Sequence, residues 1–307
     1  MPSSRPQQTL ARPAVVAGHG YWTGSRVVVE FRPAPVDAGL YFVRDDLVGA
    51  PRVPVGIAAH QPAARRTILS QSGATVEMVE HVLAALCGLG VDNCEIGVTA
   101  AELPGCDGSA LAFVEAIVLA GLRTQTAPST PLVVEQPVRC TDGPRWIEAR
   151  PAIGDGLSVE YNLDYGADAA IPAQWAVAEV TPATFCAELA PARTFVLEAE
   201  AEAIRSQGLA SHVSPRDLLI FGDDGPIENT LRFPDECARH KALDVVGDLA
   251  LAGRPVVGHI VAHRSGHRLN AELVGKLLAL AESSSSETPS SPNQPQSPGQ
   301  PPRRRSA

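Results

Sequence analysis

The sequence presents the same order of elements on both sides of a break at residues 127–131, which read Ala-Pro-Ser-Thr-Pro. A cluster of proline, serine and threonine interrupts regular structure. This cluster stands between a helical pattern and the strand-like run PLVVEQPVRC. Residues 27–31 and 41–44 before the break, and 145–150 and 157–163 after it, are predicted strands. The repeat predicts two similar units in one chain.

Each unit contains one principal predicted helix. In the helix at 79–89, apolar residues three and four apart form a stripe that faces a core, namely Val79, Val82, Leu83 and Leu86. The helix at 234–251 carries a similar stripe, made of Cys237, Leu243, Val246 and Leu249. Strands with a few helices in each unit favour an α+β fold, with helices on one side of a sheet in each unit. We expect the first domain at residues 1–127 and the second at 128–282.

The composition is typical of a globular protein, with 45% hydrophobic and 19% charged residues in a chain of 307. No apolar run is long enough to span a bilayer, and residues 1–8 lack the pattern of a secretory signal. We therefore expect a cytoplasmic monomer. The formal charge of −9 argues against nucleic acid as a partner. Residues 283–307, rich in serine, proline and glutamine, are predicted to form a disordered tail.

The strongest chemical signal lies in the second predicted helix. His240 and Asp244 are four residues apart, so they lie on one helix face and can offer two ligands to one metal ion. Asp248 extends this face by another turn, and carboxylates near a core need partners. Far upstream, Glu80 stands directly beside His81. Two histidines, a carboxylate and a nearby glutamate match the composition of a catalytic zinc site.

Each of these signals also has an ordinary interpretation. Glu80 and His81 alone could be a surface glutamate beside a half-buried histidine, and His240 with Asp244 could be a helix-stabilising pair. Adjacent helix residues point about 100° apart, so Glu80 would approach a metal on His81 from the side, as a base does. His267 follows a glycine at a predicted strand-to-helix turn, which can place an imidazole at the edge of a cleft.

Several separated motifs occur in the order of one known family. They run from about Thr9 to Leu280 and include VEH with AALCGLGVDN, ELPGCDGSA, PARTF, LRFPDECARHKALDVVGDL and SGHRLN. With them the chain resembles the UDP-3-O-acyl-N-acetylglucosamine deacetylases, the zinc enzymes of lipid A synthesis. The resemblance implies two similar β/α sandwich domains packed face to face, with a zinc site at their junction. His81, His240 and Asp244 are expected to hold the zinc. Ligand type alone also permits iron(II).

The resemblance implies roles for the remaining site residues. Glu80 is expected to be the general base and His267 the catalytic histidine, with Asp248 orienting its ring. Thr194, in the PARTF motif, is expected to help to hold the oxyanion. Two further positions are expected to line the substrate site, Phe195 and Lys241.

The implied reaction is hydrolysis of the N-acetyl amide of UDP-3-O-(3-hydroxyacyl)-N-acetylglucosamine, with release of acetate. Some departures from the family pattern bear on the substrate more than on the chemistry. Trp22 replaces a histidine, Met78 replaces a serine or threonine at an expected helix N-cap, and His212 and Val213 replace two glycines. Two alternatives stay open. One is a zinc amidohydrolase acting on another N-acyl amino-sugar, and the other is a catalytically silent relative that binds a nucleotide sugar or a protein partner.

Overall fold

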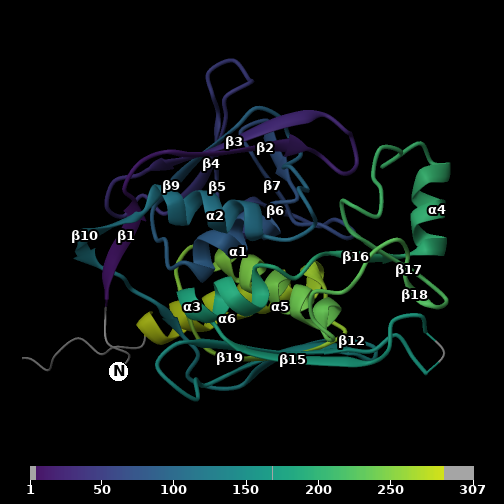
Figure 1. Ribbon diagram of the computed structural model, residues 1–307. Coiled ribbons are helices and arrows are strands. Elements are labelled where there is room, and N and C mark those ends of the chain that lie inside the picture. Colours follow the sequence, from purple (N-terminus) through teal and green to yellow (C-terminus); the bar gives the residue numbers. More distant parts are fainter. Residues whose placement is uncertain (1–4, 168, 287–307) are drawn as a thin grey trace, which may run out of the picture.

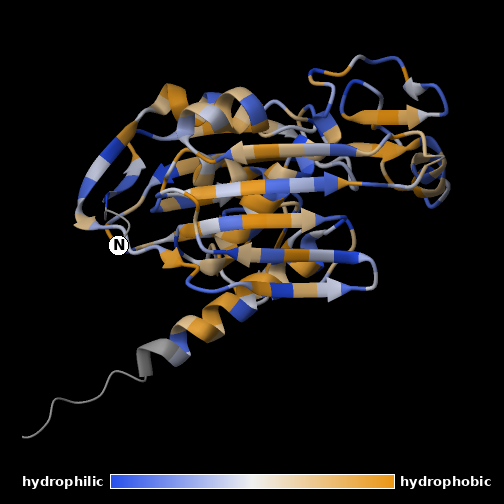
Figure 2. Ribbon diagram, turned by 90° about the horizontal axis from the view of Figure 1, so that it is seen from below, coloured by the Kyte–Doolittle hydropathy of each residue, from blue (hydrophilic) through white to orange (hydrophobic). Residues whose placement is uncertain are grey.

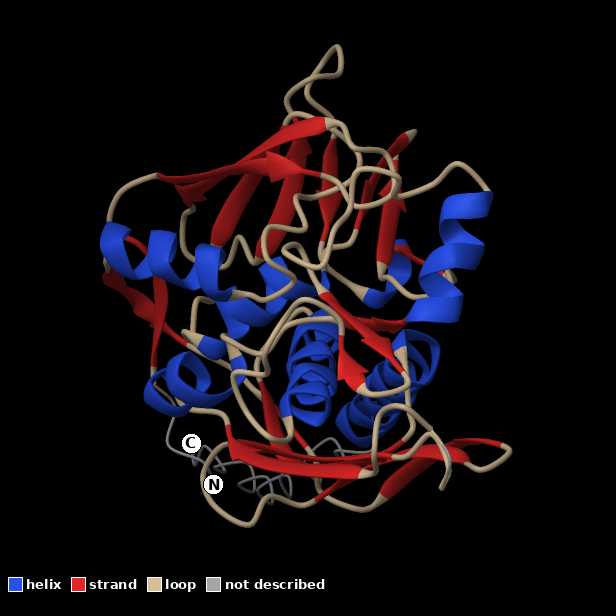
Figure 3. Ribbon diagram, turned by 45° about the vertical axis from the view of Figure 1, so that its right-hand side comes forward, coloured by secondary structure: helices blue, strands red, loops and turns tan. Residues whose placement is uncertain are grey.

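Two large β-sheets form the outer layers of the molecule, and helices fill the space between them (Figures 1 and 3). This computed structural model describes residues 5–167 and 169–286. The combination of sheets and helices confirms the predicted α+β class. In the following, the first half denotes residues 5–128 and the second half denotes residues 129–286.

The chain order of the elements is the same in outline for both halves. The first half contains β1 (Pro6–Leu10), β2 (Ala14–His19), β3 (Arg26–Pro33), β4 (Leu40–Arg44), β5 (Arg52–Pro54), β6 (His60–Gln61), β7 (Ile68–Gln71), β8 (Ala74–Glu77), α1 (Glu80–Gly88), β9 (Cys94–Val98), α2 (Leu111–Ala120) and β10 (Leu122–Pro128). The second half contains β11 (Leu132–Val133), β12 (Val138–Asp142), β13 (Arg145–Arg150), β14 (Leu157–Leu163), β15 (Gln174–Glu179), α3 (Pro182–Thr184), β16 (Phe195–Leu197), α4 (Glu198–Ser206), β17 (Leu219–Gly222), β18 (Gly225–Pro226), α5 (Glu236–Leu249), β19 (Val256–His263) and α6 (His267–Ser286).

The two large sheets have the same strand order and the same pairing senses. The first sheet has the order β2-β3-β9-β4-β5, with β4 and β9 parallel and the other neighbours antiparallel. The second sheet repeats it as β12-β13-β19-β14-β15, with β14 and β19 as its parallel pair, and β11 also pairs with β19. Helices α1 and α5 therefore hold equivalent places, each just before the central strand of its sheet.

The second sheet has one face on the helices and one face outward. Along β15 the residues alternate between buried and exposed, which is the pattern of a sheet covered on one side only. Figure 2 shows the corresponding mixture of hydrophobic and hydrophilic residues along the strands of this sheet. The covered face directs its apolar side chains toward the helices at the centre.

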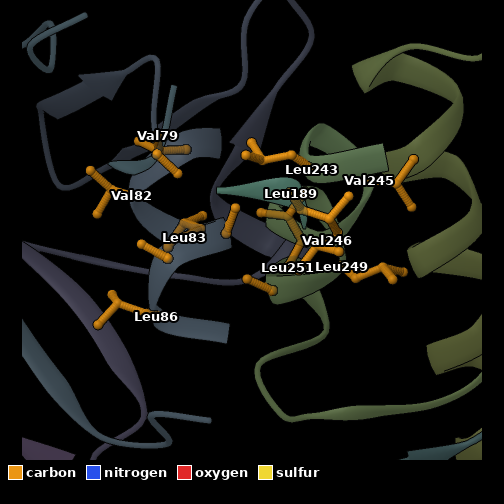
Figure 4. Close-up of a cluster of buried hydrophobic side chains, with 14 of the residues drawn as sticks. Val79, Val82, Leu83, Leu86, Leu189, Leu243, Val245, Val246, Leu249 and Leu251 are labelled. Carbon is orange, nitrogen blue, oxygen red and sulfur yellow. The ribbon is translucent and has the colours of Figure 1, made fainter. Parts of the chain in front are cut away.

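Helices α1 and α5 pack against each other between the two sheets, and Figure 4 shows their apolar side chains gathered at the contact. Both stripes predicted from the sequence are buried. A fully buried leucine or valine contributes about 1.5–3 kcal/mol relative to an exposed one. The helices approach so closely that a Cβ atom on Gly247 would lie 2.1 Å from the carbonyl oxygen of Glu80. Position 247 therefore requires glycine for the two halves to meet.

Each half carries a small sheet inserted before its central helix. In the first half, β6, β7 and β8 form an antiparallel sheet. In the second half, β16, β17 and β18 form a mixed sheet, in which β16 and β17 are parallel and β17 and β18 antiparallel, and α4 stands beside it away from the two large sheets (Figure 1). These insertions are where the two halves differ most.

Helix α6 continues through Ser286, beyond the predicted start of the tail at residue 283. Residues 287–307 of that predicted tail lie outside the described residues. Within residues 5–167 and 169–286, no helix combines the length and the apolar character that a membrane crossing requires.

Candidate active site

Glu80 and His81 begin helix α1, and both side chains are buried. The N-cap position of this helix is Val79, which makes no side-chain cap. The expectation that Met78 occupies the N-cap is therefore wrong, because the helix begins one residue later than that pattern predicted. Met78 instead has a φ of 59°, a left-handed conformation that is unfavourable for a bulky side chain.

Helix α5 presents His240, Asp244 and Asp248 as buried side chains one turn apart, as their spacing predicts. The first turn of α5 is fixed by Glu236, whose buried carboxylate accepts hydrogen bonds from Arg193 Nε at 2.8 Å and Nη2 at 3.1 Å. Removing one partner of such a buried pair costs about 3–5 kcal/mol, because it leaves an uncompensated charge. The pair therefore attaches the segment before β16 firmly to α5.

His81, His240 and Asp244 form a cluster at the contact between the two central helices. One ligand atom from each residue lies within 4.8 Å of the other two. The Nε2 atoms of His240 and His81 lie 3.4 Å and 3.7 Å from Asp244 Oδ1. Two imidazole nitrogens and one carboxylate oxygen are a donor set that a tetrahedral metal ion accepts with one position left for water or substrate.

The hydrogen bonds and the charges of these residues also fit a metal ion. Asp244 Oδ1 is buried and accepts no hydrogen bond from the described residues, so it lacks the partner that a buried oxygen needs. His240 Nδ1 lies 3.1 Å from the carbonyl oxygen of Ala192, which places the proton on Nδ1 and leaves Nε2 free to bind.

Burial lowers the pKa of His240 to about 3, so its ring is neutral. Burial opposes the ionisation of Asp244, but the charge of Lys241 and the neighbouring imidazoles together outweigh it, and the pKa of Asp244 lies well below its ordinary value. A neutral imidazole and an ionised carboxylate are the forms that bind a metal.

Thr67 joins three of the predicted site residues, and no motif in the sequence pointed to it. Its backbone N–H donates to Glu80 Oε2 at 3.0 Å, and its hydroxyl donates to Asp248 Oδ1 at 2.6 Å. The hydroxyl oxygen also lies 3.2 Å from His267 Nδ1. The residue stands at the end of the loop before β7, so the insertion of the first half supports groups from both halves.

His267 is the first residue of α6, and its ring is held by Asp248. His267 Nδ1 lies 2.8 Å from Asp248 Oδ2, and Asn270 Nδ2 donates to the same oxygen at 2.8 Å. Burial disfavours the charged ring, but the negative charge of Asp248 and this hydrogen bond outweigh it and raise the pKa of His267 to about 9. Burial raises the pKa of Glu80. The site thus combines a charged imidazolium with a carboxylate of increased basicity.

The three remaining predicted residues lie on the wall of the same site. Lys241 Nζ donates to Asp244 Oδ2 at 2.6 Å. The Phe195 ring meets the His240 ring edge to face, with 6.3 Å between their centroids. The backbone N–H of Thr194 donates to the carbonyl oxygen of Gly108 at 2.7 Å, which fixes the segment at the junction of the two halves.

A cavity of about 840 Å³ opens over this cluster and is lined by both halves. Eight of the nine predicted site residues line it, and the ninth, Asp248, lies behind His267. One part of the wall is apolar and consists of Tyr21, Trp22, Met78, Ala210, Val213 and Leu218. Another part carries charged side chains, namely Asp142, Arg145, Arg264 and Arg268. The wall therefore combines an apolar surface with a part that carries three arginines, Arg145, Arg264 and Arg268.

Known proteins resemble this chain over most of its length. The family of UDP-3-O-acyl N-acetylglycosamine deacetylases matches residues 7–279. The UDP-3-O-acyl-N-acetylglucosamine deacetylase of Thermosynechococcus vestitus is 40% identical over 270 residues, which cover 87% of this chain and 92% of that protein. The proteins of the same name from Anaeromyxobacter sp. (strain Fw109-5) and Myxococcus xanthus are 41% and 37% identical, over 89% and 91% of this chain and 88% of each relative.

Proposed function

This chain belongs to the UDP-3-O-acyl-N-acetylglycosamine deacetylase family, and we propose that it hydrolyses the N-acetyl amide of UDP-3-O-acyl-N-acetylglucosamine in lipid A synthesis. One observation carries the proposal. At the junction of the two halves, a set of metal-ligand side chains, a buried carboxylate and an imidazolium surround a single cavity. A module that only bound its ligand would have no use for a base and an acid beside a metal set.

We propose zinc as the metal, with His81, His240 and Asp244 as its ligands. When bound, zinc supplies a Lewis acid for the amide carbonyl and lowers the pKa of a water molecule. The orphaned Asp244 Oδ1 and the free Nε2 of His240 support this assignment. The same donor set accepts iron(II), so metal analysis of the purified protein decides between the two.

Proton transfer falls to Glu80 and His267. Glu80 accepts a proton from the attacking water, and its raised pKa makes it a stronger base than a solvated glutamate. The Nδ1 atom of His267 is bonded to Asp248, so the proton on Nε2 is the one available to the leaving amine. Thr194 lies on the cavity wall, where its hydroxyl serves the developing oxyanion.

The two kinds of wall match the two ends of this substrate. The acyl chain is apolar and fits the part of the wall around Trp22, Met78 and Val213. The diphosphate is anionic, and Arg145 and Arg264 offer guanidinium groups to it on the charged part, where Arg268 is paired with Asp142. The amide then lies between these ends, beside the metal-ligand set.

The test is acetate release from UDP-3-O-(3-hydroxymyristoyl)-N-acetylglucosamine by zinc-loaded protein. We expect Glu80→Gln to lower kcat by about 10²- to 10⁴-fold, the usual contribution of a general base, while its zinc content stays unchanged. Glu115→Gln is the matched control, because Glu115 is exposed on α2. The proposal fails if the zinc-loaded wild type releases no acetate.

A further inference from the structure

A second hollow of about 470 Å³ adjoins the cavity at its apolar part. Five residues line both spaces and therefore form the partition between them: Trp22, Ala64, Arg65, Glu200 and Ile204. Trp22 is the largest of them. Arg65 and Glu200 form an ion pair at 2.8 Å, which joins the loop before β7 to α4 across the same partition.

The backbone of Trp22 is held rigidly. Its N–H donates to Glu102 Oε1 at 2.7 Å, and the N–H of Thr23 donates to Glu102 Oε2 at 2.9 Å. Glu102 is itself buried. Hydrogen bonds to a buried charged group are among the stronger ones in proteins. The turn at residues 22–23 therefore cannot move without leaving a buried carboxylate unpaired.

The ring of Trp22 is fixed as well. The guanidinium of Arg66 lies over it, 4.8 Å from the ring centroid, and Arg66 Nε lies 2.9 Å from Glu77 Oε2. The ring also packs against a small apolar cluster that contains Met78 and Val213. A tryptophan held by both kinds of contact acts as a wall rather than as a mobile side chain.

Several of the residues that depart from the family pattern lie in this wall. Trp22, Met78 and Val213 pack into one cluster, although they are far apart in the sequence. His212 also takes part, because its Nε2 lies 2.9 Å from the carbonyl oxygen of Gly20 and its ring fills the space beside Gly24. Four substitutions that meet at one place indicate a single change in the shape of the cavity.

The backbone of the wall is strained in a way that supports a functional shape. Arg65, Met78 and Ala210 all have positive φ values of 64°, 59° and 51°. Each such conformation costs a non-glycine residue about 1 kcal/mol or more and persists only where the surrounding structure imposes it. All three residues line the cavity.

We infer that Trp22, supported by Met78 and Val213, is the specificity-determining residue that closes the apolar part of the cavity and limits the length of the acyl chain. The inference rests on the proposed function and adds the residue that selects the substrate. An acyl chain that ends at the ring is fully buried. A longer chain has to displace the ring or leave the cavity, whereas without the ring it enters the adjoining hollow.

The test compares kcat/KM for substrates whose acyl chains are lengthened two carbons at a time. We divide kcat/KM for chains longer than the wild-type optimum by kcat/KM for the optimal chain. In Trp22→Ala, we expect this quotient to rise about tenfold or more. Trp175→Ala is the matched control, because Trp175 is exposed on β15 and lines neither space. An unchanged length profile in Trp22→Ala, with acetate still released, would overturn the inference and leave the proposed function intact.

A binding measurement separates the two proposals. Calorimetric titration with 3-hydroxy fatty acids of the same lengths needs no turnover, so it reports on the wall even if the wild type releases no acetate. We expect Trp22→Ala to bind the longer acids more tightly than the wild type, and equal affinities would overturn the inference. Trp22→His, which restores the residue of the family pattern, serves in both measurements if the alanine variant does not fold.

Discussion

The two halves of the molecule share one sheet topology but contribute different chemistry to the site. From equivalent positions, α1 supplies Glu80 and His81 at its first turn, whereas α5 supplies His240 and Asp244 in its middle. Helix α6 begins with His267, while α2, the helix that follows the central strand of the first sheet, has no predicted site residue. A shared topology thus determines where side chains can meet, and the sequence of each half determines which groups do.

The insertions extend this contrast. The small sheet β6-β7-β8 belongs to the first half, and the loop before β7 brings Thr67 into hydrogen bonds with Glu80 and Asp248. The small sheet β16-β17-β18 belongs to the second half and brings Phe195 to the cavity wall. The first half therefore supports groups of the second half, and both halves line the cavity, so neither half alone contains the whole candidate site.

The largest effect is expected from removing one metal ligand from either half. Both His81→Ala and His240→Ala should lose bound zinc. Loss of a residue that only supports a metal ligand lowers activity by about 10- to 100-fold, and these two variants should lose more than that. Metal analysis and acetate release measure the two effects. His259→Ala, at a histidine outside the cluster, is the control. Zinc retention at wild-type affinity by either ligand variant would break the equivalence of the two halves.

The pH profile should separate the base of the first half from the acid of the second. The proposed mechanism needs Glu80 ionised, and burial raises its pKa, so activity should be lost as the pH falls through a value above the ordinary pKa of glutamate. His267 acts protonated, so activity should be lost as the pH rises through its pKa. That pKa is about 9, and a bound dication would lower it.

Asp248→Asn removes the negative charge that raises the pKa of His267. The basic limb of the profile of kcat/KM against pH should therefore move to lower pH by about 1–3 units, while the acid limb moves less. Asp46→Asn, whose carboxylate pairs with Arg44, should leave both limbs unchanged. A basic limb that stays in place in Asp248→Asn would show that another group sets it.

The close contact between the halves predicts a loss of stability in Gly247→Ala. The new Cβ would collide with the backbone carbonyl of Glu80, and overpacking of this kind costs about 1–3 kcal/mol. Gly275→Ala is a matched control in α6, because its Cβ would meet no atom closer than 3.9 Å. The control should be neutral or stabilising by about 0.5–1 kcal/mol. Urea unfolding of both variants measures the difference, and equal stabilities would show that the helices separate easily.

The smallest effect is expected where the two insertions meet. Arg65→Ala removes the ion pair with Glu200, whose side chains are 48% and 38% exposed. Solvent screens such a pair, so the free energy of unfolding should fall by only about 0.2–1 kcal/mol. Thermal unfolding measures the effect. The melting temperature of Arg65→Ala should lie close to that of the wild type, and the difference should be smaller still in high salt. A larger loss would mean that the insertions contribute to the stability of the whole molecule.

Much of this arrangement could be predicted where a regular spacing encodes it. The helix with His240, Asp244 and Asp248 was predicted from residue spacing, and the observed α5 begins at Glu236, two residues after the predicted start. The stripe of α1 was equally clear. In both cases a helical period maps sequence distance directly onto position in space.

Other parts carry no such signal. Thr67 is a single threonine before a short strand, and no sequence pattern distinguishes it. It nevertheless contacts groups from α1, α5 and α6. The pairing of Arg193 with Glu236 spans 43 residues. The meeting of Trp22 with Val213 depends on how two loops from different halves pack. Contacts of this kind depend on tertiary packing, which no local period records.

The approach of Gly247 to Glu80 has a consequence for how the protein opens. Amide hydrogens in α1 and α5 lie in the best-packed region and should exchange with solvent only when the whole chain unfolds, whereas those of the loop before β7 and of α4 should exchange through local opening. The proposed reacting groups on α1 and α5 are thereby fixed to the slowest-opening part of the molecule, whereas the ion pair of Arg65 with Glu200, beside the proposed acyl-chain wall, lies in a faster-opening part. With Trp22 as the proposed selector, mutations can alter chain-length preference at little cost to catalysis, so the selectivity would be more evolvable than the chemistry.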